Sequence, residues 1–149
     1  KEALALIDAR SGSHVKGKAF FTRIDGKVTL ALIVEGAEPG THAVHLHEKG
    51  DCSAPDATSA GGHWNPSTDA HGKFGSEHFH HGDIGNLEVG ADGKGSMTIS
   101  SELWTIGGAP ETDVVGHAVI IHAKADDFTT QPTGNAGGRV GCGVIESKQ

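Results

Sequence analysis

Two histidines separated by one residue, His45 and His47, are the first residues whose types and spacing could do chemistry. Successive side chains of an extended strand point to opposite faces, so both imidazoles point the same way and Leu46 points to the other face. Two imidazoles one strand step apart can bind a single transition metal. The pair is not diagnostic in a chain with 11 histidines. A metal site is favoured by further candidate ligands downstream, namely His63, His71, His80, Asp83 and His122.

Together these candidate ligands comprise six imidazoles, one carboxylate and no thiolate. Imidazole suits copper and zinc, and one carboxylate among imidazoles is common for zinc. Seven ligands are too many for one tetrahedral site, but they are the right number for two sites that share one residue. The sequence therefore predicts two neighbouring metal sites.

Length and composition limit the number of domains and the kinds of partner that the chain can have. A chain of 149 residues is expected to form one domain, residues 1–149. The net charge of −7 argues against a nucleic-acid or anionic-membrane partner held by bulk charge. No apolar run of about 18 residues exists, so we expect no membrane span. The chain begins with Lys1 in a strand-like segment, so we expect no signal peptide within it, and the lack of an initiating Met favours a processed form whose signal has been removed.

The elements that must position the histidines are short strands. Alternating or apolar runs bounded by turn residues predict eight of them, at 3–9, 14–24, 28–35, 41–48, 84–89, 96–100, 114–122 and 140–145. Two long polar connections, 49–82 and 123–139, contain candidate ligands or lie beside them, and long loops of this kind are usually functional. No segment has a sustained helical period. The pattern predicts an all-β antiparallel sandwich or flattened barrel.

Two cysteines, Cys52 and Cys142, lie 90 residues apart. Neither belongs to a Cys-x-x-Cys motif, so a zinc knuckle or a thioredoxin-like motif is disfavoured. A disulfide between them is the leading interpretation, and it would favour an oxidising compartment.

Five motifs occur in an order and spacing that resemble those of the copper,zinc superoxide dismutases, especially bacterial ones, through nearly the whole chain. They are His-Leu-His-Glu at 45–48, Gly-Gly-His-Trp-Asn-Pro at 61–66, His-His-Gly-Asp-Ile-Gly-Asn at 80–86, His-Ala-Lys-Ala-Asp-Asp at 122–127, and Gly-Asn-Ala-Gly-Gly-Arg-Val-Gly-Cys-Gly at 134–143. The resemblance implies an eight-stranded Greek-key β-barrel with two long functional loops.

The same resemblance implies roles for individual residues. Copper would be held by His45, His47, His63 and His122, and zinc by His63, His71, His80 and Asp83. His63 would therefore bridge the two ions and be catalytic. Asp126 would accept N–H bonds from His45 and His71, and Cys52 and Cys142 would form the family disulfide. Arg139 would stand over the copper as a catalytic residue that guides the anionic substrate, with Thr133 narrowing the channel opposite it.

The implied activity is the conversion of superoxide to dioxygen and hydrogen peroxide by Cu(II)/Cu(I) cycling, with copper and zinc as cofactors. Superoxide would be the partner; no nucleic acid is expected, and a homodimer is compatible with the resemblance. A periplasmic or secreted location is expected. A copper-buffering protein on the same fold and a zinc hydrolase are the alternatives. Arg139 disfavours the buffer, and the lack of a general-base carboxylate beside an open three-ligand zinc site disfavours the hydrolase.

Several points stay open at this level. His78 competes with His80 as a zinc ligand, although the spacing to Asp83 favours His80. The loop 123–139 carries no Glu and lacks the acidic and basic steering residues of eukaryotic relatives. Other lysines, such as Lys49 or Lys73, could supply the steering charge.

Overall fold

Alternating hydrophobicity produces the strands of the computed structural model, which describes residues 1–148. The strands are β1 Glu2–Ala9, β2 Lys16–Ile24, β3 Lys27–Glu35, β4 Gly40–His47, β5 Asp83–Val89, β6 Gly95–Ser101, β7 Ala118–His122, β8 Arg139–Val144 and β9 Glu146–Lys148. Within residues 1–148, the only helical turn is the short 3-10 helix Thr58–Ala60.

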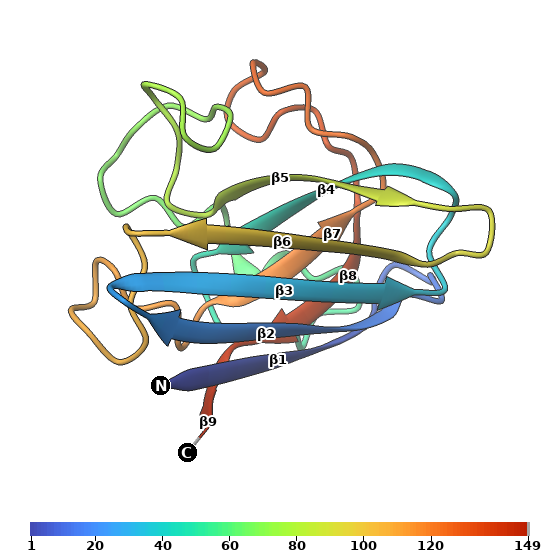
Figure 1. Ribbon diagram of the computed structural model, residues 1–149. Coiled ribbons are helices and arrows are strands. Elements are labelled where there is room, and N and C mark those ends of the chain that lie inside the picture. Colours follow the sequence, from blue (N-terminus) through green and yellow to red (C-terminus); the bar gives the residue numbers. More distant parts are fainter. Residues whose placement is uncertain (149) are drawn as a thin grey trace.

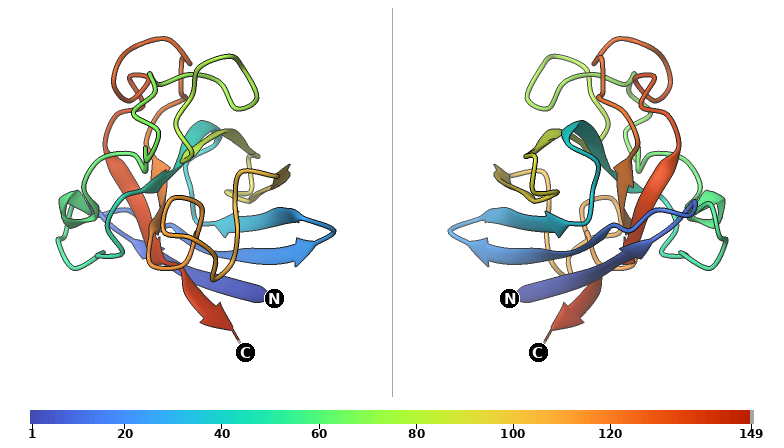
Figure 2. Two further views of the ribbon diagram at one scale, coloured as in Figure 1. Left: turned by 90° about the vertical axis from the view of Figure 1, so that its left-hand side faces the viewer. Right: turned by 90° about the vertical axis from the view of Figure 1, so that its right-hand side faces the viewer.

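The strands form one antiparallel sheet that curls into a nearly closed barrel (Figures 1 and 2). The strand order is β5-β4-β7-β8-β1-β2-β3-β6, and β9 pairs with β1 beside this path. The neighbours β3–β6 and β4–β7 are not consecutive in the chain, which is the crossover expected of a Greek key. The predicted all-β, eight-stranded barrel is confirmed. The additional β9 was not predicted, because its three exposed residues carry no apolar signal.

The core fills the inside of the barrel with the inward-facing residues of each strand. In β3, Val28, Leu30, Leu32 and Val34 are buried, and their neighbours along the strand are more exposed. Strand β4 differs, because its residues from His42 to His47 are all buried. One face of β4 packs on the core through residues such as Leu46, so something else must cover the histidine face.

The two long loops provide that cover. Residues 48–82 and 123–138 lie on the same side of the barrel, next to β4, β7 and β8 (Figures 1 and 2). Backbone hydrogen bonds attach both loops to β4. The N–H of Ala43 donates to the carbonyl of Lys124 at 2.8 Å, and the N–H of Trp64 donates to the carbonyl of Leu46 at 2.9 Å. The fold therefore encloses a set of polar side chains between sheet and loops.

The predicted strand 114–122 was wrong at its start, because β7 begins only at Ala118. The N–H of His117 donates to the carbonyl of Val114, and Gly116 has a φ of +90°, so the chain turns here instead of extending. Val114 is nevertheless fully buried, which explains why its apolar character was mistaken for a strand position. No helix within residues 1–148 has the length and apolar character needed to cross a membrane.

Candidate metal centre

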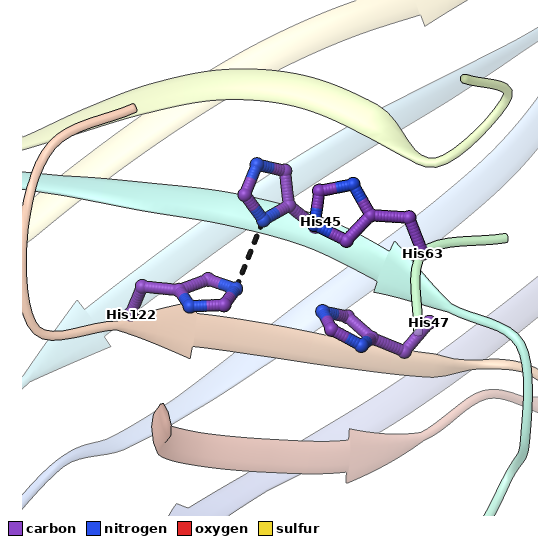
Figure 3. A group of neighbouring side chains, drawn as sticks. All are labelled: His45, His47, His63 and His122. Atoms are coloured by element: carbon purple, nitrogen blue, oxygen red, sulfur yellow. Dashed lines mark hydrogen bonds between the residues drawn. The ribbon is translucent and has the colours of Figure 1, made fainter. Parts of the chain in front are cut away.

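Four imidazoles converge from three segments of the chain (Figure 3). His45 and His47 come from β4, and His122 ends β7. His63 comes from the first long loop, where it forms an isolated β-bridge with His47. One potential ligand atom from each of these four histidines lies within 4.8 Å of the others. We call this set the four-histidine cluster.

Hydrogen bonds outside the cluster determine which ring nitrogens face inward. His47 donates from Nδ1 to the carbonyl of Gly61 at 2.8 Å, and His45 donates from Nε2 to Asp126 Oδ2 at 2.8 Å. The inward atoms are then His47 Nε2 and His45 Nδ1, and the latter lies 2.9 Å from His122 Nε2. The Nε2 atoms of His47 and His63 are buried and have no hydrogen-bond partner among residues 1–148.

A second group of polar side chains surrounds Asp83, the first residue of β5. Asp83 Oδ1 lies 3.0 Å from His63 Nδ1, 2.8 Å from His71 Nδ1 and 3.5 Å from His80 Nδ1. The other oxygen, Oδ2, accepts the backbone N–H groups of Gly72 at 3.1 Å and His80 at 2.7 Å. We call His63, His71, His80 and Asp83 the Asp83 cluster. His63 belongs to both clusters, with one ring nitrogen in each.

The ligand atoms of His45 also lie within 4.8 Å of those of His63, His71 and Asp83. The hydrogen bonds separate His45 from this group, since its Nε2 donates to Asp126 and its Nδ1 faces His122. His80 Nδ1, by contrast, lies 3.1 Å from His63 Nδ1. His80 therefore fits the Asp83 cluster better than His45 does.

Asp126 joins the two clusters from outside. Its Oδ2 accepts from His45 Nε2 and its Oδ1 accepts from His71 Nε2, both at 2.8 Å. Gly134 lies directly against this bridge, because a Cβ at that position would collide with Asp126 Oδ1 and His71 Nε2. Each bonded histidine must then present its other nitrogen, Nδ1, to its cluster.

Electrostatics keep most of the imidazoles neutral. Burial and the neighbouring imidazoles hold the pKa values of His47 and His122 well below the usual value for histidine. Burial lowers the pKa of His63 to about 4, and the hydrogen bond to Asp83 opposes this shift only in part. These rings present lone pairs at neutral pH, as metal ligation requires.

His71 and the two aspartates behave differently. Burial lowers the pKa of His71, but hydrogen bonds to Asp126 and Asp83 outweigh this effect and raise it to about 9. Burial raises the pKa values of Asp83 and Asp126, but hydrogen bonds from histidines outweigh it and hold both carboxyls well below their usual range. Both aspartates are therefore carboxylates, and in the metal-free protein His71 carries a proton between them.

Arg139, the first residue of β8, pairs with His122 across the sheet. Its Nη1 donates to the carbonyl of Ala57 at 2.9 Å. Partial burial lowers the pKa of Arg139, but the group remains charged at neutral pH. Thr133 is half-buried in the turn before Gly134, and no hydrogen bond or ion pair among residues 1–148 links it to Arg139.

The predicted disulfide is confirmed. Cys52 and Cys142 are bonded with their Cα atoms 5.7 Å apart. The bond links the first long loop to β8, three residues beyond Arg139.

The two competing histidines lie in different environments. His80 is 5% exposed and lies in the Asp83 cluster. The side chain of His78 is 64% exposed, and its Nδ1 lies 3.0 Å from Asp69 Oδ1. This hydrogen bond raises the pKa of His78. His78 thus lies outside both clusters.

Sequence reasoning assigned no role to Asn86 or Gly134, although both lie in the quoted motifs. Asn86 exchanges two hydrogen bonds with the backbone of Asp126, and Gly134 leaves space for the Asp126–His71 bridge. Gly134 has a φ of +74°, and a glycine beside a site can signal such a close approach. The sequence contained no comparable signal for Asn86.

The donor sets suit two different transition metals. Four imidazoles with inward nitrogens fit copper, and three imidazoles with one carboxylate fit zinc. The Nε2 atoms of His47 and His63, which are buried and have no partner among residues 1–148, support this fit. A buried polar atom without a partner is costly unless a ligand satisfies it.

Comparison with known proteins agrees with this geometry. The family model described as copper/zinc superoxide dismutase matches residues 15–145. A relative named copper-zinc superoxide dismutase from Caulobacter vibrioides is 40% identical over 149 residues, covering 97% of this chain and 85% of the relative. The chain belongs to the copper/zinc superoxide dismutase family, whose members use copper and zinc to remove superoxide.

Proposed function

We propose that the four-histidine cluster holds copper through His45 Nδ1, His47 Nε2, His63 Nε2 and His122 Nε2. The Asp83 cluster holds zinc through His63 Nδ1, His71 Nδ1, His80 Nδ1 and Asp83 Oδ1. The observation that carries this assignment is the division of the His63 ring. Its Nε2 is buried and unpaired within residues 1–148, and its Nδ1 lies 3.0 Å from Asp83 Oδ1.

When bound, copper supplies a one-electron redox couple that takes an electron from one superoxide and returns it to a second, while zinc keeps a fixed charge. The protein residues bind the anion and handle the protons. His63 can hold a proton at Nε2 and release it, because zinc on Nδ1 would keep that proton acidic. A proton delivered from this atom, together with one from solvent, completes hydrogen peroxide.

Arg139 captures the anionic substrate. Its guanidinium is half-buried. Its positive charge contributes to lowering the pKa values of His47 and His122, so its electric field extends to both histidines. A guanidinium stays protonated at every working pH and attracts a small anion to the pocket. Thr133 would narrow the channel opposite Arg139, as the family resemblance implies.

Metal analysis combined with a superoxide-removal assay tests the assignment. Reconstituted protein should contain about one copper and one zinc per chain. His63→Ala should remove the ring that bridges the two clusters. Removal of the bridge should weaken both sites and change the copper electron paramagnetic resonance spectrum. Copper at one per chain without activity would instead indicate a copper buffer.

The remaining proposals concern the whole chain. We propose a single domain over residues 1–149 with superoxide as its substrate and no nucleic-acid ligand. The net charge of −7 supports the absence of a nucleic-acid ligand. A periplasmic or secreted location is supported by the Cys52–Cys142 disulfide. A homodimer stays a prediction that analytical ultracentrifugation of the metal-loaded protein can test.

A further inference from the structure

We propose that the turn between β1 and β2, residues 10–13, is a positioning element for Arg139. This inference rests on the proposed role of Arg139 in anion capture. The turn contributes no candidate ligand to either cluster, and it lies far from Arg139 in sequence. It nevertheless holds both the backbone of Arg139 and the loop that orients its guanidinium.

The first set of contacts is to the start of β8. Ser11 donates from Oγ to the carbonyl of Arg139 itself at 2.7 Å. Ser13 donates from Oγ to the carbonyl of Val140 at 2.6 Å, and the backbone N–H of Arg10 donates to the same carbonyl at 2.9 Å. Three donors from one turn therefore fix two consecutive peptide groups at the base of the Arg139 side chain.

The second set is to the loop that contains Cys52. Arg10 donates from Nε to the carbonyl of Cys52 at 2.8 Å, and the N–H of Ser11 donates to the carbonyl of Pro55 at 2.7 Å. Two residues further on, the carbonyl of Ala57 accepts from Arg139 Nη1 at 2.9 Å. The turn thus also fixes the segment whose carbonyl orients the guanidinium.

The backbone of the turn is strained in a way that packing does not explain. Ser11 has a φ of +56°, which is uncommon for a residue other than glycine, and its side chain is exposed. Glycine would adopt this conformation more easily. A serine supplies the hydroxyl that binds the Arg139 carbonyl, and this contact gives a reason for its presence.

Two hydrogen bonds of the side chain explain why position 10 holds an arginine. Its Nε–H binds the Cys52 carbonyl while its Nη1–H binds the carbonyl of Ala9 at 2.7 Å. A planar guanidinium can serve two carbonyls at once, which a lysine cannot reproduce in the same geometry. Arg10 therefore acts through its shape and not only through its charge.

The experiment compares Ser11→Gly, Arg10→Gln and Arg10→Lys with two references. Arg139→Gln measures the full loss of anion capture. Arg23→Gln removes the same charge from an exposed arginine and is the matched control. For each metal-loaded variant, kcat/KM for superoxide is measured at low and high ionic strength. In the apoprotein, the rate at which phenylglyoxal modifies Arg139 is followed by peptide mass.

We expect Ser11→Gly and Arg10→Gln to lower kcat/KM by about three- to tenfold at both ionic strengths, because misplacement, unlike lost charge, is not screened by salt. Arg139 should react about threefold faster with phenylglyoxal, since a guanidinium released from Ala57 is more accessible. Arg10→Lys should not restore the rate, and Arg23→Gln should leave both measurements unchanged.

Unchanged kcat/KM and unchanged Arg139 reactivity in Ser11→Gly and Arg10→Gln, alongside a large loss in Arg139→Gln, would overturn the positioning proposal. Full rescue by Arg10→Lys would also overturn it, because charge would then suffice. If Arg139→Gln itself kept full activity, the proposed role of Arg139 would fail instead. Should Arg10→Gln fail to fold, Ser11→Gly carries the test, because it removes only one exposed hydroxymethyl group.

Discussion

Asn86 and Asp126 are joined by two hydrogen bonds of opposite direction. Asn86 Nδ2 donates to the carbonyl of Asp126 at 3.1 Å, and the N–H of Asp126 donates to Asn86 Oδ1 at 2.8 Å. Asn86 lies in β5, whereas Asp126 belongs to the second long loop. This exchange attaches the loop to the barrel at Asp126, which binds His45 and His71. Strand β5 therefore restrains one histidine of each cluster through Asp126.

Replacing Asn86 by Ala should therefore affect both stability and metal binding. Loss of two hydrogen bonds, with the N–H of Asp126 left unsatisfied, should lower the free energy of unfolding of the apoprotein by about 2–3 kcal/mol. Zinc affinity should fall by about tenfold or more, as for other residues that orient metal ligands. Urea unfolding and competition with a chromophoric chelator measure the two effects.

A matched control for Asn86→Ala exists in the first long loop. Asn65 makes the same two bonds with the backbone of Asp69, at 2.9 and 3.0 Å, but Asp69 holds no residue of either cluster. Asn65→Ala should lower stability with little change in zinc affinity. Equal loss of zinc affinity in both variants would show that Asn86 has no special connection to the site.

Gly134→Ala should disrupt the bridge between Asp126 and His71. The added Cβ would collide with Asp126 Oδ1 and His71 Nε2, and the φ of +74° adds strain. We expect zinc affinity to fall by about 100-fold, because a bonded pair that orients a ligand must move apart. Isothermal titration of the apoprotein with zinc measures this. Gly75→Ala is the control, since Gly75 has a φ of +84° but an added Cβ there would meet no heavy atom of residues 1–148 within 4 Å.

The sequence was sufficient for most of the barrel because alternation along a strand is a local signal. In β3, the buried positions Val28, Leu30, Leu32 and Val34 repeat every second residue, and this repeat alone predicts the strand. The same reasoning failed at Val114, which is buried for a different reason. A turn ending at Gly116 directs its side chain inward, and burial in a turn has no period.

The sequence predicted the candidate ligands of the two clusters but not the residues that hold these ligands in place. The candidate ligands could be identified because histidines and an aspartate at fixed spacings are rare, and metal chemistry restricts what they can do. The supporting contacts were not predictable. The contacts of Asn86 with Asp126 and of Ser11 with Arg139 join residues 40 and 128 positions apart, and asparagine and serine are common in any loop. Their roles depend on three-dimensional proximity, which no local pattern encodes.

His80→Ala and His78→Ala should differ sharply in zinc content. His80 lies in the Asp83 cluster, with its Nδ1 3.1 Å from His63 Nδ1, and His78 is exposed beside Asp69. We expect His80→Ala to weaken zinc binding by about 100-fold or more, and His78→Ala to keep full zinc content after dialysis. Loss of zinc only in His78→Ala would reverse the assignment.

The pKa of His78, followed by NMR, should fall in Asp69→Asn, because the hydrogen bond that raises it is weakened.

Zinc binding to the apoprotein should strengthen as pH rises. The pKa of His71 is raised to about 9, so the apoprotein holds a proton there that zinc must displace from Nδ1. Affinity should therefore rise by up to about tenfold per pH unit between neutral pH and about pH 9, and then level off. Competition titrations across this range measure the slope, and a flat profile would show that His71 is already neutral in the apoprotein.

The same proton should make apoprotein stability change in the opposite direction. Because the pKa of His71 is higher in the folded than in the unfolded protein, its contribution to stability is complete below the unfolded value of 6.5 and is lost as pH rises towards about 9. The midpoint of urea unfolding of the apoprotein should fall over this window. With zinc bound the proton is absent, so the metal-loaded protein should not show this loss. A parallel decline in both forms would assign the effect to groups other than His71.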